Sequence, residues 1–149
     1  MTLNIIIGFI VPWILGLGFI KDKKLMFVFV PLAVALATVT DTIGFNYFWF
    51  LQPRFRNASL SALPFNLGLY PIVSCFMLYF ISNKGVKAVS SVLVTSVFLT
   101  VIEWIFKEFD RVTYFNGWNI FWTFISYVVP AVVLYLYSIS FFKFFRKSP

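Results

Sequence analysis

The chain has 149 residues, of which 61% are hydrophobic and 11% are charged. Ordinary soluble domains carry about 25% charged residues, so this composition excludes a soluble globular protein. The formal net charge of +7 does not indicate nucleic acid as a partner, because the basic residues lie in short gaps between apolar runs, where they face phospholipid headgroups. The expected partner is the lipid bilayer.

Five apolar runs are long enough to cross hydrocarbon about 30 Å thick as α-helices. The first covers residues 3–20 and is uncharged. We interpret it as a span, because it lacks the basic leading region and the small-residue cleavage site of a signal peptide. The second covers residues 25–51 and contains one charge, Asp41, while the third, residues 62–82, contains none.

The fourth run covers residues 88–106 and contains Glu103. The uncharged stretch that follows is too long for one helix, so we expect residues 112–116 to form an interfacial loop and the fifth span to cover residues 117–142. The prediction is a single all-α transmembrane domain, residues 1–149, built as a polytopic bundle of five helices.

The distribution of basic residues predicts the orientation, because short cytoplasmic loops are enriched in Lys and Arg. The loops after the first and third spans, together with the C-terminal tail, share one side and hold eight of the twelve basic residues. The other side holds Arg54, Arg56, Lys107 and Arg111. We therefore expect the N-terminus outside and the C-terminus in the cytoplasm.

Four prolines lie inside the predicted spans: Pro12, Pro31, Pro71 and Pro130. Each removes a backbone donor and leaves a carbonyl that a neighbouring helix or water must satisfy. Kinked helices are the expected result.

Two carboxyl groups inside the membrane are the most informative side chains. A bare carboxylate within hydrocarbon costs about 2.5 to 3.5 kcal/mol by insertion scales, so each must face protein or water. Asp41 belongs to a stripe of small residues, Ala33, Ala37, Asp41 and Gly44, with spacings of four, four and three. Such a stripe lets helices approach closely, so we place Asp41 on a packing face.

Polar stripes also follow three other spans. Their members include Asn66 and Tyr70 on the third, Glu103 on the fourth and Asn119 on the fifth. The predicted topology puts these groups in the outer half of the bilayer, with the first span peripheral. We therefore predict one outward-facing pocket for a ligand or an ion, formed by Asp41, Asn66, Tyr70, Glu103, Trp118 and Asn119.

A purely structural interpretation stands beside this one. Glu103 and Lys107 are four residues apart in the favourable order for a helix pair, and Asp41 can pair with Arg54 or Arg56 or stay protonated in apolar surroundings. Under that interpretation Arg54, Arg56 and Lys107 contact anionic headgroups. The alternative role for Arg54 and Arg56 is recognition of an anionic ligand.

The sequence offers little for catalysis or metal binding. It has no histidine, and its single cysteine, Cys75, lies within an apolar run, so we expect no disulfide within the chain, no metal site and no cofactor. No hydrolase, metalloprotease or nucleotide-binding motif is present. We assign no catalytic residues.

One segment resembles the hallmark of a family. Ile102-Glu103-Trp104, followed by residues 112–122 reading V-T-Y-F-N-G-W-N-I-F-W, is similar to a motif of small multi-spanning membrane proteins from spore-forming Gram-positive bacteria. Their usual form is I-E-W or I-E-Y and then T-Y-x-N-G-W-N-x-W-W, so Phe121 replaces the first of two tryptophans. The resemblance implies a bacterial cytoplasmic membrane and points to Glu103, Gly117, Trp118 and Asn119, but it implies no activity.

The motif also has a direct physical interpretation. Asn116-Gly117 is a turn signal, Trp118 is expected to anchor the start of the fifth helix, and Asn119 is expected to point toward Glu103. Spans four and five then form a hairpin.

Three functions follow as expectations. The first is a non-enzymatic binding or accessory subunit that acts with another membrane protein or with itself as an oligomer. The second is a small oligomeric transporter or channel in which Asp41 or Glu103 takes up a proton or a cation. The third is a lipid-modifying enzyme that uses both carboxylates, with Arg54 or Arg56 holding a phosphate.

Overall fold

The computed structural model describes residues 1–145, and in this range the chain is all-α apart from two short strands. Two of its long helices contain a π-helical segment, labelled η. The elements in chain order are α1 (Thr2–Ile5), η1 (Ile6–Ile10), α2 (Val11–Phe19), α3 (Lys23–Tyr47), β1 (Trp49–Leu51), α4 (Ser59–Pro64), η2 (Phe65–Leu69), α5 (Tyr70–Lys84), α6 (Ala88–Glu108), β2 (Val112–Tyr114) and α7 (Ile120–Phe145).

Five helices of this structure are long enough and apolar enough to cross a membrane: Thr2–Phe19, Lys23–Tyr47, Ser59–Lys84, Ala88–Glu108 and Ile120–Phe144. Large apolar side chains point outward along all of them, with Phe27 86% exposed and Val94 69% exposed. An apolar surface of this extent needs an apolar neighbour. The prediction of five long apolar helices is confirmed.

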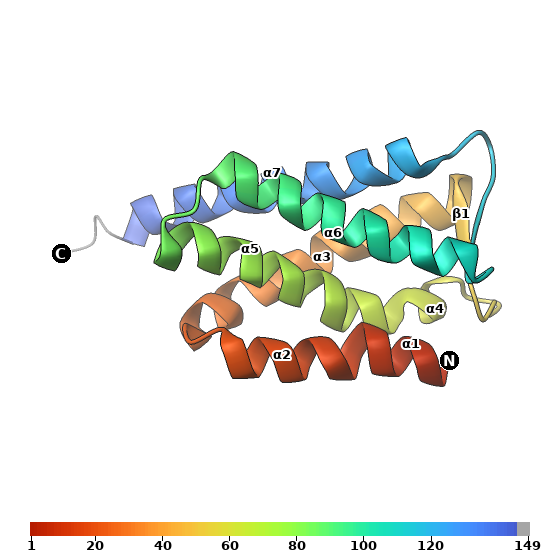
Figure 1. Cartoon of the computed structure of the whole chain (residues 1–149), viewed down its shortest axis with the longest axis horizontal. Coiled ribbons are helices and arrows are strands. Elements are labelled where there is room, and N and C mark those ends of the chain that lie inside the picture. Colours follow the sequence, from red (N-terminus) through yellow and green to blue (C-terminus); the bar gives the residue numbers. More distant parts are fainter. Residues whose placement is uncertain (146–149) are drawn as a thin grey trace.

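The connections alternate between the two ends of the bundle (Figure 1). The N-terminus, both strands and the α6–α7 connection lie at one end, while the turns after α2 and α5 and the end of α7 lie at the other. Lys21, Lys23, Lys84 and Lys87 therefore share an end, as the orientation argument requires. Arg146 and Lys147, which that argument also uses, lie outside the described residues.

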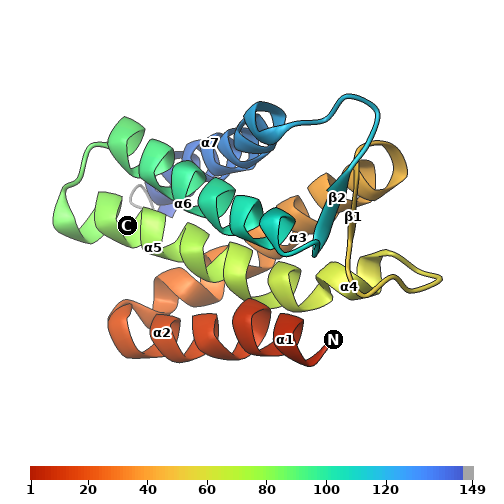
Figure 2. The same cartoon turned by 45° about the vertical axis from the view of Figure 1, so that its right-hand side comes forward.

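The two strands were not predicted. β1 pairs with β2 in antiparallel register, with Phe50 opposite Thr113, and the pair lies across the end of the bundle that carries the N-terminus (Figure 2). The helix of the second span therefore ends at Tyr47, and the prediction of a helix at residues 49–51 is wrong. The predicted loop at residues 112–116 is wrong for residues 112–114, which form β2. An apolar run does not by itself distinguish a helix from a buried strand.

The first helix packs closely against the third span through two glycines. A Cβ built on Gly68 would lie 2.2 Å from the Gly8 carbonyl oxygen, and one on Gly8 would lie 3.0 Å from the Phe65 amide nitrogen. The Gly8 carbonyl is also the group that loses its α-helical donor at Pro12.

Pro71 confirms the expectation that a neighbouring helix satisfies a freed carbonyl. It leaves the Leu67 oxygen without its α-helical donor, and Trp13 Nε1 on the first helix donates to that oxygen at 2.9 Å. This bond gives the indole nitrogen of Trp13, which lies within the first span, a partner.

The densest hydrophobic core lies toward the end of the bundle opposite the strands. Its fully buried members include Ile20, Phe29, Leu78 and Leu134. α5 is central, since it contacts α2, α3, α6 and α7. Helices α3, α5, α6 and α7 also enclose a space that side chains do not fill.

Candidate functional site

That space is a cavity of about 80 Å³ bounded by α3, α4, η2, α5, α6, α7 and the two strands. Strand residues Trp49, Leu51 and Val112 are part of its lining. That the cavity opens toward the outside stays a prediction. Three of the predicted pocket residues line it, Asp41, Tyr70 and Glu103. The structure thus brings the two membrane carboxyl groups to one cavity, and the first helix contributes no lining residue, as expected.

Asp41 lies on the predicted packing face of α3. It is 8% exposed, and Ala33 and Ala37 from the same stripe line the cavity with it. The Asn66 side chain, from η2, interacts with the Asp41 carboxyl group. Among the described residues, Asp41 Oδ2 and Asn66 Oδ1 are nevertheless buried without a hydrogen-bond partner. Asn66 Oδ1 is an acceptor, and so is Asp41 Oδ2 when the carboxyl group is ionised, so in that state this part of the site lacks a donor.

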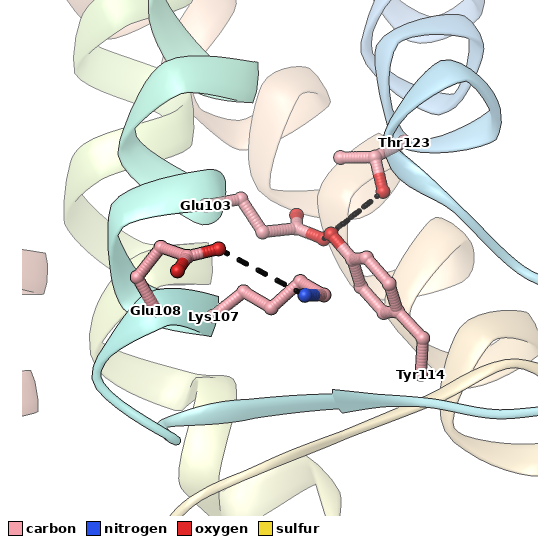
Figure 3. A network of polar contacts seen from close by, with 5 residues as sticks. All are labelled: Glu103, Lys107, Glu108, Tyr114 and Thr123. Carbon is pink, nitrogen blue, oxygen red and sulfur yellow. Dashed lines mark hydrogen bonds and ion pairs between the residues drawn. The ribbon is translucent and has the colours of Figure 1, made fainter.

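Glu103 has the opposite surroundings, because hydroxyl groups donate to its carboxylate (Figure 3). Tyr127 Oη donates to Oε2 at 2.5 Å, and Tyr114 Oη donates to Oε1 at 2.6 Å. Thr123 Oγ1 lies 3.2 Å from Oε1 and 2.9 Å from Tyr114 Oη. The carboxylate of α6 therefore links α7 and β2.

Tyr114 keeps its proton in this arrangement. Burial, together with the neighbouring Glu103 carboxylate, raises the pKa of the Tyr114 phenol. The phenol therefore remains a donor at neutral pH. On the other side of the network, the Tyr70 and Tyr127 hydroxyl oxygens lie 3.4 Å apart, and their rings are 5.8 Å apart between centroids.

Trp118 and Asn119 do not line the cavity. The Trp118 ring packs on Phe48 and Trp49, with centroid distances of 4.4 and 4.9 Å, and its Nε1 donates to Thr123 Oγ1 at 2.9 Å. Trp118 therefore supports the Glu103 network through its hydrogen bond to Thr123.

The prediction that Asn119 points toward Glu103 is wrong. Asn119 is exposed, and its Oδ1 accepts from the Phe121 and Trp122 amides at 3.0 and 3.3 Å. This is the role of a helix N-cap, because the first amides of a helix lack partners within it. The preceding turn is as predicted, with Asn116 and Gly117 both at positive φ.

The basic residues do not neutralise the two carboxyl groups. Arg54 lies over the Phe50 ring at 4.2 Å, and Arg54 and Arg56 are exposed. The Lys107 ammonium lies 4.0 Å from Glu108, so the expected Glu103–Lys107 pair is replaced by the hydroxyl network (Figure 3). Arg54, Arg56 and Lys107 lie near the end of the bundle that carries the strands, where headgroup contact stays a prediction.

Sequence reasoning missed Tyr114, Tyr127 and Asn4. Tyr127 follows Thr123 by four residues, a spacing that would have placed both on one helix face. Asn4 is fully buried, its Nδ2 donates to the Gln52 and Ser61 carbonyls at 2.9 and 3.1 Å, and its Oδ1 accepts from Arg111 at 3.3 Å. One asparagine early in an apolar run was the available signal.

Chemically, the site combines mostly apolar walls with a buried carboxyl oxygen, Asp41 Oδ2, that has no partner among the described residues. Among residues 1–145, no group of three or more His, Cys, Asp or Glu side chains is placed to hold a metal ion. No protein-family model, curated protein or solved structure matches this chain, and the family suggested by the Glu103 and Gly117–Trp118 motif stays a prediction.

Proposed function

We propose that this chain is an integral protein of a bacterial cytoplasmic membrane, with its N-terminus outside and its C-terminus in the cytoplasm. The five long apolar helices and their exposed apolar side chains support membrane insertion. The lysines gathered at the end opposite the strands support the orientation.

The orientation is tested with single cysteines in a Cys75→Ala background. Asn57→Cys lies between β1 and α4, and Lys87→Cys lies between α5 and α6, at the opposite end. A thiol reagent that does not cross membranes should label Asn57→Cys in intact cells and should label Lys87→Cys after lysis. The reverse pattern would invert the orientation.

Within the membrane, the chain acts as a non-enzymatic binding or accessory subunit that takes a small ligand into its cavity. The observation that carries this proposal is Asp41 Oδ2, a buried carboxyl oxygen on the cavity wall without a partner. Leaving a buried oxygen without a hydrogen bond costs about 1 to 3 kcal/mol of stability. A structural role alone therefore gives no reason for its presence. An accessory role implies another membrane protein, or a second copy of this chain, as the partner.

Thermal unfolding of the purified chain tests the binding role, because a ligand that binds the folded state raises the unfolding temperature. Small cations, neutral molecules and anions are added in turn. Ala37→Leu fills the cavity, whereas Ala35→Leu adds the same side chain at an exposed position of α3 and serves as the control. We expect stabilisation of the wild type and of Ala35→Leu, and none of Ala37→Leu. Equal stabilisation of both variants would place binding elsewhere.

A transporter or channel is the second candidate. Pro130 lines the cavity, and the π-helical segment η2 supplies Asn66 beside it. Irregular helices at an intramembrane site are typical of transporters, and five helices would need to oligomerise to form a path. Uptake of a labelled ligand into proteoliposomes, lost in Asp41→Asn, would favour this candidate.

The lipid-modifying enzyme has less support. It requires Arg54 or Arg56 to hold a phosphate near the carboxyl groups, yet both side chains are exposed and neither lines the cavity.

A further inference from the structure

The residues that line the cavity carry charge of one sign. Asp41 and Glu103 are among them, and within residues 1–145 no lysine or arginine is. An anion in this space would face two carboxyl groups without a compensating cation, an arrangement that low-dielectric surroundings penalise strongly. The charge distribution therefore favours a cation over an anion.

The unpartnered atoms specify hydrogen bonding as well as charge. Asp41 is 8% exposed and Asn66 is 3% exposed, so solvent at the protein surface does not serve them. Their unpartnered atoms, Oδ2 and Oδ1, both accept hydrogen bonds. Of the two residues only Asp41 lines the cavity, so a matching ligand must donate a hydrogen bond to Asp41 Oδ2, which an ammonium group does and a quaternary nitrogen does not.

Aromatic rings form much of the remaining wall. They come from Phe45, Trp49, Phe65, Tyr70, Phe106 and Tyr127. Phe65 contacts both Tyr70 and Phe106, with centroids 6.2 and 5.5 Å apart, so these rings form a continuous surface. Aromatic rings attract cations and also cover the carbon atoms of an organic ion.

The volume limits the size of the ligand. At about 80 Å³, the cavity has about half the volume of an engineered cavity of ~150 Å³ that binds benzene, which has six carbon atoms. A ligand with about three non-hydrogen atoms fits this space. Ethylammonium has that size.

Resting on the proposed binding function, we infer that the ligand class is a small primary ammonium ion. Its nitrogen donates to Asp41 Oδ2, and its carbon atoms lie against the aromatic wall. Glu103 stays with its hydroxyl donors and contributes charge at longer range. Asp41 is then the residue that determines specificity, and Asn66 positions its carboxyl group from outside the cavity.

The experiment compares three probes of similar size by thermal unfolding of the full chain at constant ionic strength: ethylammonium, ethanol and acetate. Ethylammonium should raise the unfolding temperature of the wild type and of Ala35→Leu in a saturable way. The shift should be lost in Ala37→Leu and weakened at least about tenfold in apparent affinity in Asp41→Asn, which corresponds to about 1.4 kcal/mol. Ala37→Leu retains both carboxyl groups, so the test does not depend on one variant folding.

The outcomes separate this inference from the function on which it rests. If ethanol or acetate stabilises the chain and Ala37→Leu abolishes the effect, the cavity binds a ligand but the ammonium class is overturned. If none of the three stabilises the wild type, both proposals fall. An ethylammonium shift that Asp41→Asn and Ala37→Leu leave unchanged would also overturn the inference, because binding would then lie outside the cavity.

Discussion

The two intramembrane carboxyl groups line the same cavity but have opposite surroundings. Glu103 accepts from the hydroxyls of Tyr114 and Tyr127, with Thr123 in contact, and so joins three elements. Asp41 has Asn66 as a neighbour and an oxygen without a partner. A buried polar group that is fully satisfied can stabilise a fold, whereas an unsatisfied one costs stability. The difference supports an architectural role for Glu103 and the proposed ligand-binding role for Asp41.

The largest effect is expected for Glu103→Leu. This change leaves the Tyr114, Tyr127 and Thr123 hydroxyls without their acceptor. Each buried donor that loses its hydrogen bond lowers the free energy of unfolding by about 1 to 3 kcal/mol. Thermal unfolding in detergent should show a large loss compared with Glu108→Leu, a change at an exposed carboxylate of the same helix. Equal losses in the two variants would contradict the structural role of Glu103.

Tyr127→Phe should have the next largest effect. It removes the hydroxyl that donates to Glu103 Oε2 at 2.5 Å, and it also removes the neighbour of the Tyr70 hydroxyl. The expected loss is about 1.5 to 3 kcal/mol, as for hydrogen bonds to charged groups. Tyr137→Phe, at an exposed position of α7, is the control and should unfold at nearly the wild-type temperature. A Tyr127→Phe variant as stable as this control would show that the network does not stabilise the fold.

Asn119→Ala should destabilise the chain by about 1 kcal/mol, the usual cost of losing an N-cap. Because its side chain caps α7 and does not reach the cavity, ligand-induced stabilisation should persist. Asn119→Ser retains an acceptor and should restore most of the stability. If Asn119→Ala also abolished the ligand-induced rise in unfolding temperature, Asn119 would belong to the binding site after all.

The smallest change in stability is expected for Asp41→Asn. The amide replaces a buried carboxyl group that has an unpartnered oxygen, so little native interaction is lost. Without ligand, the unfolding temperature should lie close to that of the wild type, and the loss should be smaller than in the matched amide variant Glu103→Gln. A larger loss in Asp41→Asn would reverse the comparison between the two carboxyl groups.

Much of the architecture could be predicted from the sequence, because the bilayer imposes strong requirements on length and polarity. The spacing of Ala33, Ala37 and Asp41 predicted the buried face of α3 correctly. Depth along the helices also predicted that Asp41, Tyr70 and Glu103 share one region. These features depend on local pattern and on position along a helix.

The features that were missed depend on pairing between distant segments. Residues 49–51 become a strand because residues 112–114 supply the partner, which no local pattern in an apolar run reveals. The choice of Tyr114 and Tyr127 over Lys107 as partners of Glu103 depends on distances across α7 and β2. Asn119 is different, since an asparagine directly before a helix is a recognised N-cap signal.

The most direct test is an experimental structure of the chain in lipid with ethylammonium present, at a resolution that shows bound molecules. We predict density in the cavity within hydrogen-bonding distance of Asp41 Oδ2, while Glu103 keeps its contacts with Tyr114 and Tyr127. An empty cavity, with Asp41 paired to a group of the protein, would contradict the assignment of Asp41 to a ligand. The two carboxyl groups would then both belong to the architecture of the bundle.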